Sequence, residues 1–93
     1  MNKEENNIII AGKPIDRYLL TTLWMLKNNP KIQSLTLNAR GSQNIAKAIL
    51  IAGILKTKEN LNIKHTEIFQ INYRDVKTGN ERLGVEIKIL LEK

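Results

Sequence analysis

The residues best suited to chemistry in this sequence are cations placed in two short turns. One turn, Gly12-Lys13-Pro14, follows an apolar run, and the other, Arg40-Gly41-Ser42, follows an alternating segment. Each turn precedes a segment with helical periodicity. The start of a helix carries free N–H groups and a partial positive charge, so a cation beside it favours binding of a phosphate group. Two such turns side by side would form a phosphate-binding edge.

Other kinds of chemistry have few residues to work with. The chain has no cysteine and one histidine, so we expect no thiolate metal site, no disulfide framework and no cysteine nucleophile. The sequence offers no convincing nucleophile–base pair, and its loops lack the G-x-x-x-x-G-K-[ST] pattern of nucleotide hydrolysis. We therefore expect no enzyme activity, no cofactor, no metal and no small-molecule substrate.

The net charge favours a polyanionic partner. The 93 residues include 15 Lys and Arg against nine Asp and Glu, which gives a net charge of +6. The surplus falls between residues 13 and 66, not in one dense run, and the charges of residues 67–93 cancel. A basic tail is therefore excluded, and a binding face must be assembled by folding. Charge on this scale is typical of proteins that bind nucleic acid.

The length suits a single domain over residues 1–93, with residues 1–6 as a flexible N-terminus. No apolar run reaches the roughly 18 residues that a membrane span needs. The first residues, MNKEENN, lack the apolar stretch of a signal peptide. We therefore expect a cytoplasmic protein without a membrane partner.

Hydropathy patterning predicts the elements that position the first turn. The β-branched run Ile8–Ala11 predicts a short strand buried on both faces. Residues 14–28 place apolar side chains on one side of a helix that begins at Pro14. Residues 32–39 alternate between apolar and polar, which predicts a half-exposed strand.

A second helix is predicted over residues 43–58, with Ser42 as its N-cap. Its centre, Ile45 to Leu55, is apolar all round and carries one charge, Lys47. Such a helix needs cover on more than one side. In so small a domain the second cover is most simply another copy of the chain. The residues expected at this dimer interface are Leu50, Ile51, Ile54 and Leu55.

Two strands are predicted after the second helix. Residues 61–74 include a period-two apolar pattern, and residues 83–91 alternate throughout. The polar residues 75–80 predict the tip of a hairpin between them. The order is β-α-β-α-β-β, an α/β chain in a two-layer α+β arrangement with a mixed sheet and two helices. Because a right-handed crossover makes the first two strands parallel, both cationic turns should emerge at the same edge of the sheet.

The predicted nucleic-acid contacts lie at that edge and in the hairpin. Lys13 and Arg40 would contact phosphates, and Gly41 would let a phosphate approach the backbone. Tyr18 faces the core by periodicity, although near the start of a helix its hydroxyl could reach the basic edge. The full set of expected contacts is Lys13, Arg17, Tyr18, Arg40, Gly41, Ser42, Lys47, Arg74, Lys77 and Arg82. The simpler interpretation is that these cations are solvated surface residues, or in the hairpin that they block strand aggregation.

Two stretches resemble the Alba family of small archaeal nucleic-acid-binding proteins. Residues 10–18, IAGKPIDRY, are similar to the family's first motif, a strand ending in Gly-Lys-Lys-Pro followed by a helix with a Tyr. Residues 37–48, LNARGSQNIAKA, are similar to its second motif, Lys-Ala-Arg-Gly-Arg-x-Ile-x-Lys-Ala. Residues 85–89 also fit its last strand. The segments follow in matching order over nearly the whole chain.

The resemblance implies a fold like the C-terminal domain of translation initiation factor 3, acting as a dimer. It also implies chromosome-associated binding of double-stranded DNA, and binding of RNA, with little sequence preference. In the family, the positions of Lys13, Arg40 and the hairpin around Lys77 contact nucleic acid, and Tyr18 stands at the family's Tyr position. The sequence does not choose DNA over RNA, nor a homodimer over a heterodimer with a paralogue.

Three cations of the family motifs are absent from this chain. Gly12 stands where the family often has the first of two lysines, Asn38 replaces a Lys, and Ser42 replaces the second Arg. The family's acetylation switch at the first lysine therefore does not transfer. Each lost phosphate contact lowers the salt dependence of log affinity by about 0.9 and weakens binding. Weaker or RNA-biased binding, or use within a heterodimer, follows as an alternative.

Two further alternatives for the function stay open. One is a subunit of a ribonucleoprotein that recognises a particular folded RNA. The other is a protein-interaction module that has lost nucleic-acid binding. Its working surface would be Leu20 and Trp24, which fall one turn apart on the side of the first helix away from its apolar face.

Overall fold

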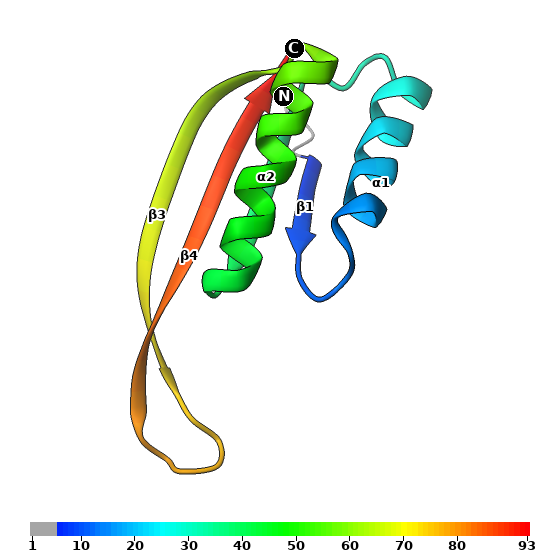
Figure 1. Cartoon of the computed structure of the whole chain (residues 1–93). Coiled ribbons are helices and arrows are strands. Elements are labelled where there is room, and N and C mark those ends of the chain that lie inside the picture. The colour runs from blue at the N-terminus through cyan, green and yellow to red at the C-terminus, as the bar shows by residue number, and fades with distance from the viewer. Residues whose placement is uncertain (1–5) are drawn as a thin grey trace.

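The computed structural model describes residues 6–93, in which four strands and two helices follow in the predicted order β-α-β-α-β-β (Figure 1). The elements are β1 (Asn6–Ile10), α1 (Ile15–Asn28), β2 (Ser34–Arg40), α2 (Ser42–Glu59), β3 (Asn62–Arg74) and β4 (Glu81–Glu92). The strands form one sheet in the order β1-β2-β4-β3. β1 is parallel to β2, as predicted, and the other pairs are antiparallel. The expected flexible N-terminus lies outside the described residues except for Asn6, which begins β1.

Both helices pack on one face of the sheet, so β1, β2 and β4 bury mainly the side chains on that face (Figure 1). In β1, Ile8 and Ile10 are buried, whereas Ile9 is 73% exposed. The prediction that this strand is buried on both faces is therefore wrong. A β-branched run does not show whether one face of the sheet or both faces are covered. Within residues 6–93, helices cover one face only. The sheet contributes to the core the residues Ile8, Ile10, Leu35, Leu37, Ala39, Ile87, Ile89 and Leu91.

The start of α2 differs from the prediction by one residue. Gly41 is the N-cap, and Ser42 is already helical, so the prediction of Ser42 as the cap is wrong. Gly41 has a φ of 88°, a backbone conformation that glycine adopts without the steric cost of a Cβ atom. Its N–H donates a hydrogen bond to the carbonyl oxygen of Val85, at 2.9 Å, and this bond ties the turn to β4.

Helix α2 buries one side against the sheet and leaves apolar residues on the other. Ile51 and Leu55 are fully buried in the chain's own core, so their predicted place in a dimer interface is wrong. A helix that is apolar all round gives no phase from which to tell its inner side from its outer side. Leu50, by contrast, is 56% exposed, and Ile54 is half-buried.

Strand β3 also carries exposed apolar residues. Ile68 pairs with Ile87, and Ile63 pairs with Leu91, so both lie on the sheet face that carries the helices. They are nevertheless exposed, because α2 packs over β2 and β4, and β3 is the edge strand beyond them. We call the set of Ile49, Leu50, Ile63 and Ile68 the lateral apolar face.

The β3–β4 hairpin extends beyond the two-layer body as an arm (Figure 1). Glu86 of β4 pairs with Arg40, the last residue of β2, so residues 81–85 run past the end of β2. At the tip, the N–H of Gly79 donates to the carbonyl oxygen of Asp75 at 2.7 Å, and the N–H of Asp75 donates to that of Asn80 at 2.9 Å. These bonds close the predicted polar turn.

Candidate nucleic-acid interface

The two cationic turns and the hairpin arm meet at one end of the sheet (Figure 1). Because β1 and β2 are parallel and in register from Asn6↔Leu35 to Ile10↔Ala39, the turns that follow them leave the sheet at the same edge. The hairpin runs past the end of β2 in the same direction. The structure thus has the adjacency that the sequence predicted for Lys13 and Arg40.

Side chains from both helices hold the backbone of the first turn. The Nζ of Lys47, on α2, donates to the carbonyl oxygens of Ala11 and Lys13, each at 3.1 Å. The hydroxyl oxygen of Tyr18, on α1, accepts hydrogen bonds from the N–H groups of Ala11 and Lys13, at 2.7 and 3.2 Å. Four backbone groups of this turn are therefore fixed by two side chains. Lys47 also joins the first turn to the start of α2, where the second turn lies.

These contacts define the roles of Tyr18 and Lys47 more closely than the sequence did. Tyr18 is buried, and its hydroxyl reaches the turn as expected. Its observed contacts are with the turn's own backbone. Lys47 likewise uses its ammonium group on backbone carbonyl oxygens, although it also adds positive charge between the two turns. Both residues shape the turn that displays Lys13.

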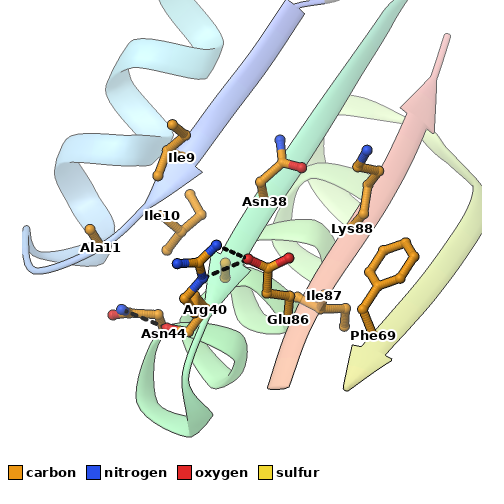
Figure 2. A pocket seen from close by; sticks show the side chains of 11 residues that line it. Ile9, Ile10, Ala11, Asn38, Arg40, Asn44, Phe69, Glu86, Ile87 and Lys88 are labelled. Atoms are coloured by element: carbon orange, nitrogen blue, oxygen red, sulfur yellow. Dashed lines mark hydrogen bonds and ion pairs between the residues drawn. The ribbon is translucent and has the colours of Figure 1, made fainter. Parts of the chain in front are cut away.

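The Arg40 side chain lies on the sheet face opposite the helices, beside Glu86 (Figure 2). Its Nε donates to Oε1 of Glu86 at 2.6 Å, and its Nη2 contacts the same oxygen. The Arg40 side chain is 72% exposed. An ion pair this accessible to water adds little stability, and a phosphate group could compete with the carboxylate for the guanidinium. Sequence reasoning missed Glu86, because the pairing depends on the register of β2 against β4.

Lys13 and Arg40 line two neighbouring hollows. Lys13 and Arg17 lie with Ile9 and Leu20 around a hollow of about 340 Å³ beside α1. Arg40 lies in a hollow of about 590 Å³ on the open face of the sheet, and Ile9 borders this one too. The two cations therefore flank the end of β1 and do not converge on one point. The arrangement suits a long polyanion with several phosphates better than a single phosphate group.

The hairpin cations differ in how far their charge is compensated. Arg82 pairs with Asp75 through Nε and Oδ2, at 3.1 Å. Asp75 also accepts a hydrogen bond from the backbone N–H of Lys77, at 2.8 Å. The side chain of Lys77 is exposed at the tip of the hairpin. Arg74 is exposed as well. The arm therefore presents Arg74 and Lys77 more openly than Arg82.

Gly41 and Ser42 line a third hollow, of about 660 Å³, between the start of α2 and the base of the hairpin. Arg40 borders this hollow as well as the one on the open sheet face. The second turn thus connects the sheet face with the hairpin arm.

Residues 6–93 contain no group of three or more His, Cys, Asp or Glu side chains placed to hold a metal ion. None of their helices is both long enough and apolar enough to cross a membrane.

A two-layer α+β chain with this strand order has counterparts among solved structures. No family model and no curated protein matches the sequence. Alba from Thermoplasma volcanium is similar in structure, with a TM-score of 0.81 and 22% identity over 95% of this chain and 100% of that one. ALBA1 from Trypanosoma brucei has a TM-score of 0.71 and 16% identity over 99% of this chain and 72% of that one. The chain therefore has the Alba fold, as its two motifs predicted.

Proposed function

We propose that this chain is a dimeric, non-enzymatic protein that binds double-stranded DNA or RNA largely without regard to sequence. The observation that supports the proposal best is the meeting of two cationic turns and a basic hairpin at one end of the sheet. The net charge of +6 and the Alba fold support it further. Such a protein would work in the cytoplasm, associated with the chromosome.

Most of the affinity would come from phosphate contacts. Lys13 and Arg17 lie beside the start of α1, and Arg40 precedes the start of α2, so each adds charge to a helix end that already favours anions. Such contacts orient a protein on the nucleic acid but carry no sequence information. The hairpin arm would reach into a groove, as basic β-ribbons do in other proteins.

The lateral apolar face supports the dimer. It carries Leu50 on α2 at 56% exposure and Ile68 on β3 at 70% exposure. Several large exposed apolar residues on neighbouring elements favour an interaction site. A second copy, related by a two-fold axis, would cover the face with the same residues and present both pairs of cationic turns. A paralogue with the same face would serve equally in a heterodimer.

A fluorescence-anisotropy titration with duplex DNA and with a structured RNA tests this proposal. The wild-type protein should bind at least one of them at micromolar concentration, and added salt should weaken the binding. The variant Lys13→Glu/Arg40→Glu should bind at least about tenfold more weakly while still dimerising. Lys31→Glu/Lys64→Glu is the matched control, with the same change in charge at the opposite end of the sheet. No salt-sensitive binding of either ligand, or equal losses in both variants, would overturn the proposal.

A second candidate function is suggested by two exposed apolar side chains on α1. Leu20 is 65% exposed, and Trp24, one helical turn further on, is 66% exposed. In a protein-interaction module this pair would be the contact surface, and Trp24→Ala would abolish binding of the partner. In a specific ribonucleoprotein, by contrast, the wild-type chain would prefer one folded RNA strongly over generic duplex.

A further inference from the structure

The open face of the sheet carries two aromatic side chains in line along β3. Phe69 is 37% exposed and Tyr73 is 48% exposed. Residues four apart on a strand project from the same face, at a separation of about 13 Å along the strand. Phe69 pairs with Glu86, whose partner Arg40 begins the turn described above, so the aromatic residues lie on the same face as the Arg40–Glu86 pair.

The Tyr73 ring is positioned by a glycine on the neighbouring strand. A Cβ atom built on Gly84 would lie 3.1 Å from Cε1 and 3.3 Å from Cδ1 of Tyr73. One edge of the ring thus lies over the backbone of β4, at a place where a side chain would push it away. The ring is held against the sheet, while about half of its residue surface stays accessible. A ring held in this way is a preformed stacking surface, unlike an exposed tyrosine ring that rotates freely.

Each aromatic residue borders a hollow that Arg40 also lines. Phe69 borders the hollow of about 590 Å³ with Arg40, Lys88 and Glu86, and Figure 2 shows its ring beside Lys88 and the Arg40–Glu86 pair. Tyr73 borders the hollow of about 660 Å³, which Arg40 also lines. The hollow at Phe69 has two cations and one carboxylate, so its charge is positive. Glu67 lies two residues before Phe69 on the same face of β3. Its Oε1 lies 2.8 Å from Nε2 of His65.

We propose that the open sheet face binds single-stranded nucleic acid, with unpaired bases stacked on Phe69 and Tyr73. Lys88 and Arg40, which line the hollow at Phe69, would contact phosphates of the bound strand. The roughly 13 Å spacing is the length of a few nucleotides, and sheet proteins that bind single-stranded RNA stack two or three bases on aromatic residues in this manner. Paired bases in a duplex are already stacked, so duplex gains nothing from these rings. This inference rests on the proposed nucleic-acid binding but assigns a different ligand to the open sheet face, which shares Arg40 with the basic edge.

Anisotropy titrations with oligo(dT) of about twelve nucleotides and with a duplex test the proposal. The variant Phe69→Ala/Tyr73→Ala should lose at least about tenfold in affinity for oligo(dT) and stay within about twofold for duplex. Phe69→Tyr/Tyr73→Phe, which keeps both rings, should bind both ligands like wild type. Trp24→Ala removes an exposed aromatic residue from α1 and should change neither affinity. An unchanged oligo(dT) affinity in the double alanine variant, or an equal loss in Trp24→Ala, would overturn the proposal.

A stacking signal checks the same contact directly. In the variant Trp24→Phe/Phe69→Trp the sole tryptophan takes the place of Phe69 on the open sheet face. Saturating oligo(dT) should quench its fluorescence emission. Binding of oligo(dT) without quenching would contradict stacking at this site. If the wild-type protein binds duplex but not oligo(dT), this inference fails and the proposed function stands. If it binds neither oligo(dT), duplex nor structured RNA, both fail.

Discussion

The Nζ of Lys47 on α2 lies 3.1 Å from the carbonyl oxygen of Lys13, in the turn that precedes α1. The two residues are 34 positions apart in the sequence. This hydrogen bond, with the matching one to Ala11, joins the two cationic turns into one surface. The basic edge is therefore held by specific contacts and does not depend on strand direction alone.

Replacing Lys47 by Met should loosen the first turn. The substitution keeps the length of the side chain but leaves two backbone carbonyl oxygens without their donor, at a cost of about 1 kcal/mol in the free energy of unfolding. Duplex affinity should fall several-fold, and hydrogen exchange should speed up at the amides of residues 11–13. Lys58→Met, at the far end of α2, is the control. A loss of affinity without faster exchange would instead make Lys47 a direct phosphate contact.

Replacing Tyr18 by Phe should remove the other half of this support. Two part-buried N–H groups, those of Ala11 and Lys13, would lose their acceptor, which costs about 1–3 kcal/mol. Thermal or urea denaturation should show the loss of stability, and duplex binding should weaken with it. The matched control is Tyr73→Phe, because the Tyr73 ring is exposed and lies against Gly84. Equal stabilities of the two variants would show that the Tyr18 hydroxyl does not support the turn.

Replacing Glu86 by Gln should strengthen nucleic-acid binding. The carboxylate pairs with Arg40 on the open face, so removing its charge leaves the guanidinium available to phosphate. Duplex affinity should rise a few-fold at low salt, and the salt dependence should become steeper by at most about 0.9 per subunit. Glu92→Gln, at the opposite end of β4, controls for the change in net charge. An affinity that rises equally in both variants would show that Arg40 has no special role.

Charge on the lateral apolar face should separate the proposed dimer. Leu50→Asp/Ile68→Asp places two carboxylates where two copies would meet, and sedimentation should then show a monomer. Ile9→Asp changes an equally exposed apolar residue on the other face of the sheet and should leave the dimer intact. A dimer that survives the double substitution would place the interface elsewhere.

Much of the fold was predictable, because each element has a clear local pattern. The polar residues around Gly79 predict the hairpin tip, and Pro14 marks the start of α1 within one residue. The parallel β1–β2 pair followed from the order of elements, and with it the shared edge of Lys13 and Arg40. These features depend on residues close together in the sequence or on the general handedness of crossovers.

What the sequence could not provide depends on tertiary contacts. The Arg40–Glu86 pair requires the register between β2 and β4. The burial of Ile51 and Leu55 requires the rotation of α2 about its own axis, which a helix apolar all round does not reveal. Ile9 is exposed because one face of the sheet is left open. A β-branched run has the same sequence pattern whether helices cover one face of the sheet or both.

The salt dependence of duplex binding tests the central claim most directly. Log affinity should fall linearly with log salt concentration. The variant Lys13→Glu/Arg40→Glu should reduce the magnitude of this slope by about 3–4 in a dimer, because each of four phosphate contacts contributes about 0.9 to it. A steepness that the double substitution leaves unchanged would contradict the account, since the polyanion would then be held by some other surface.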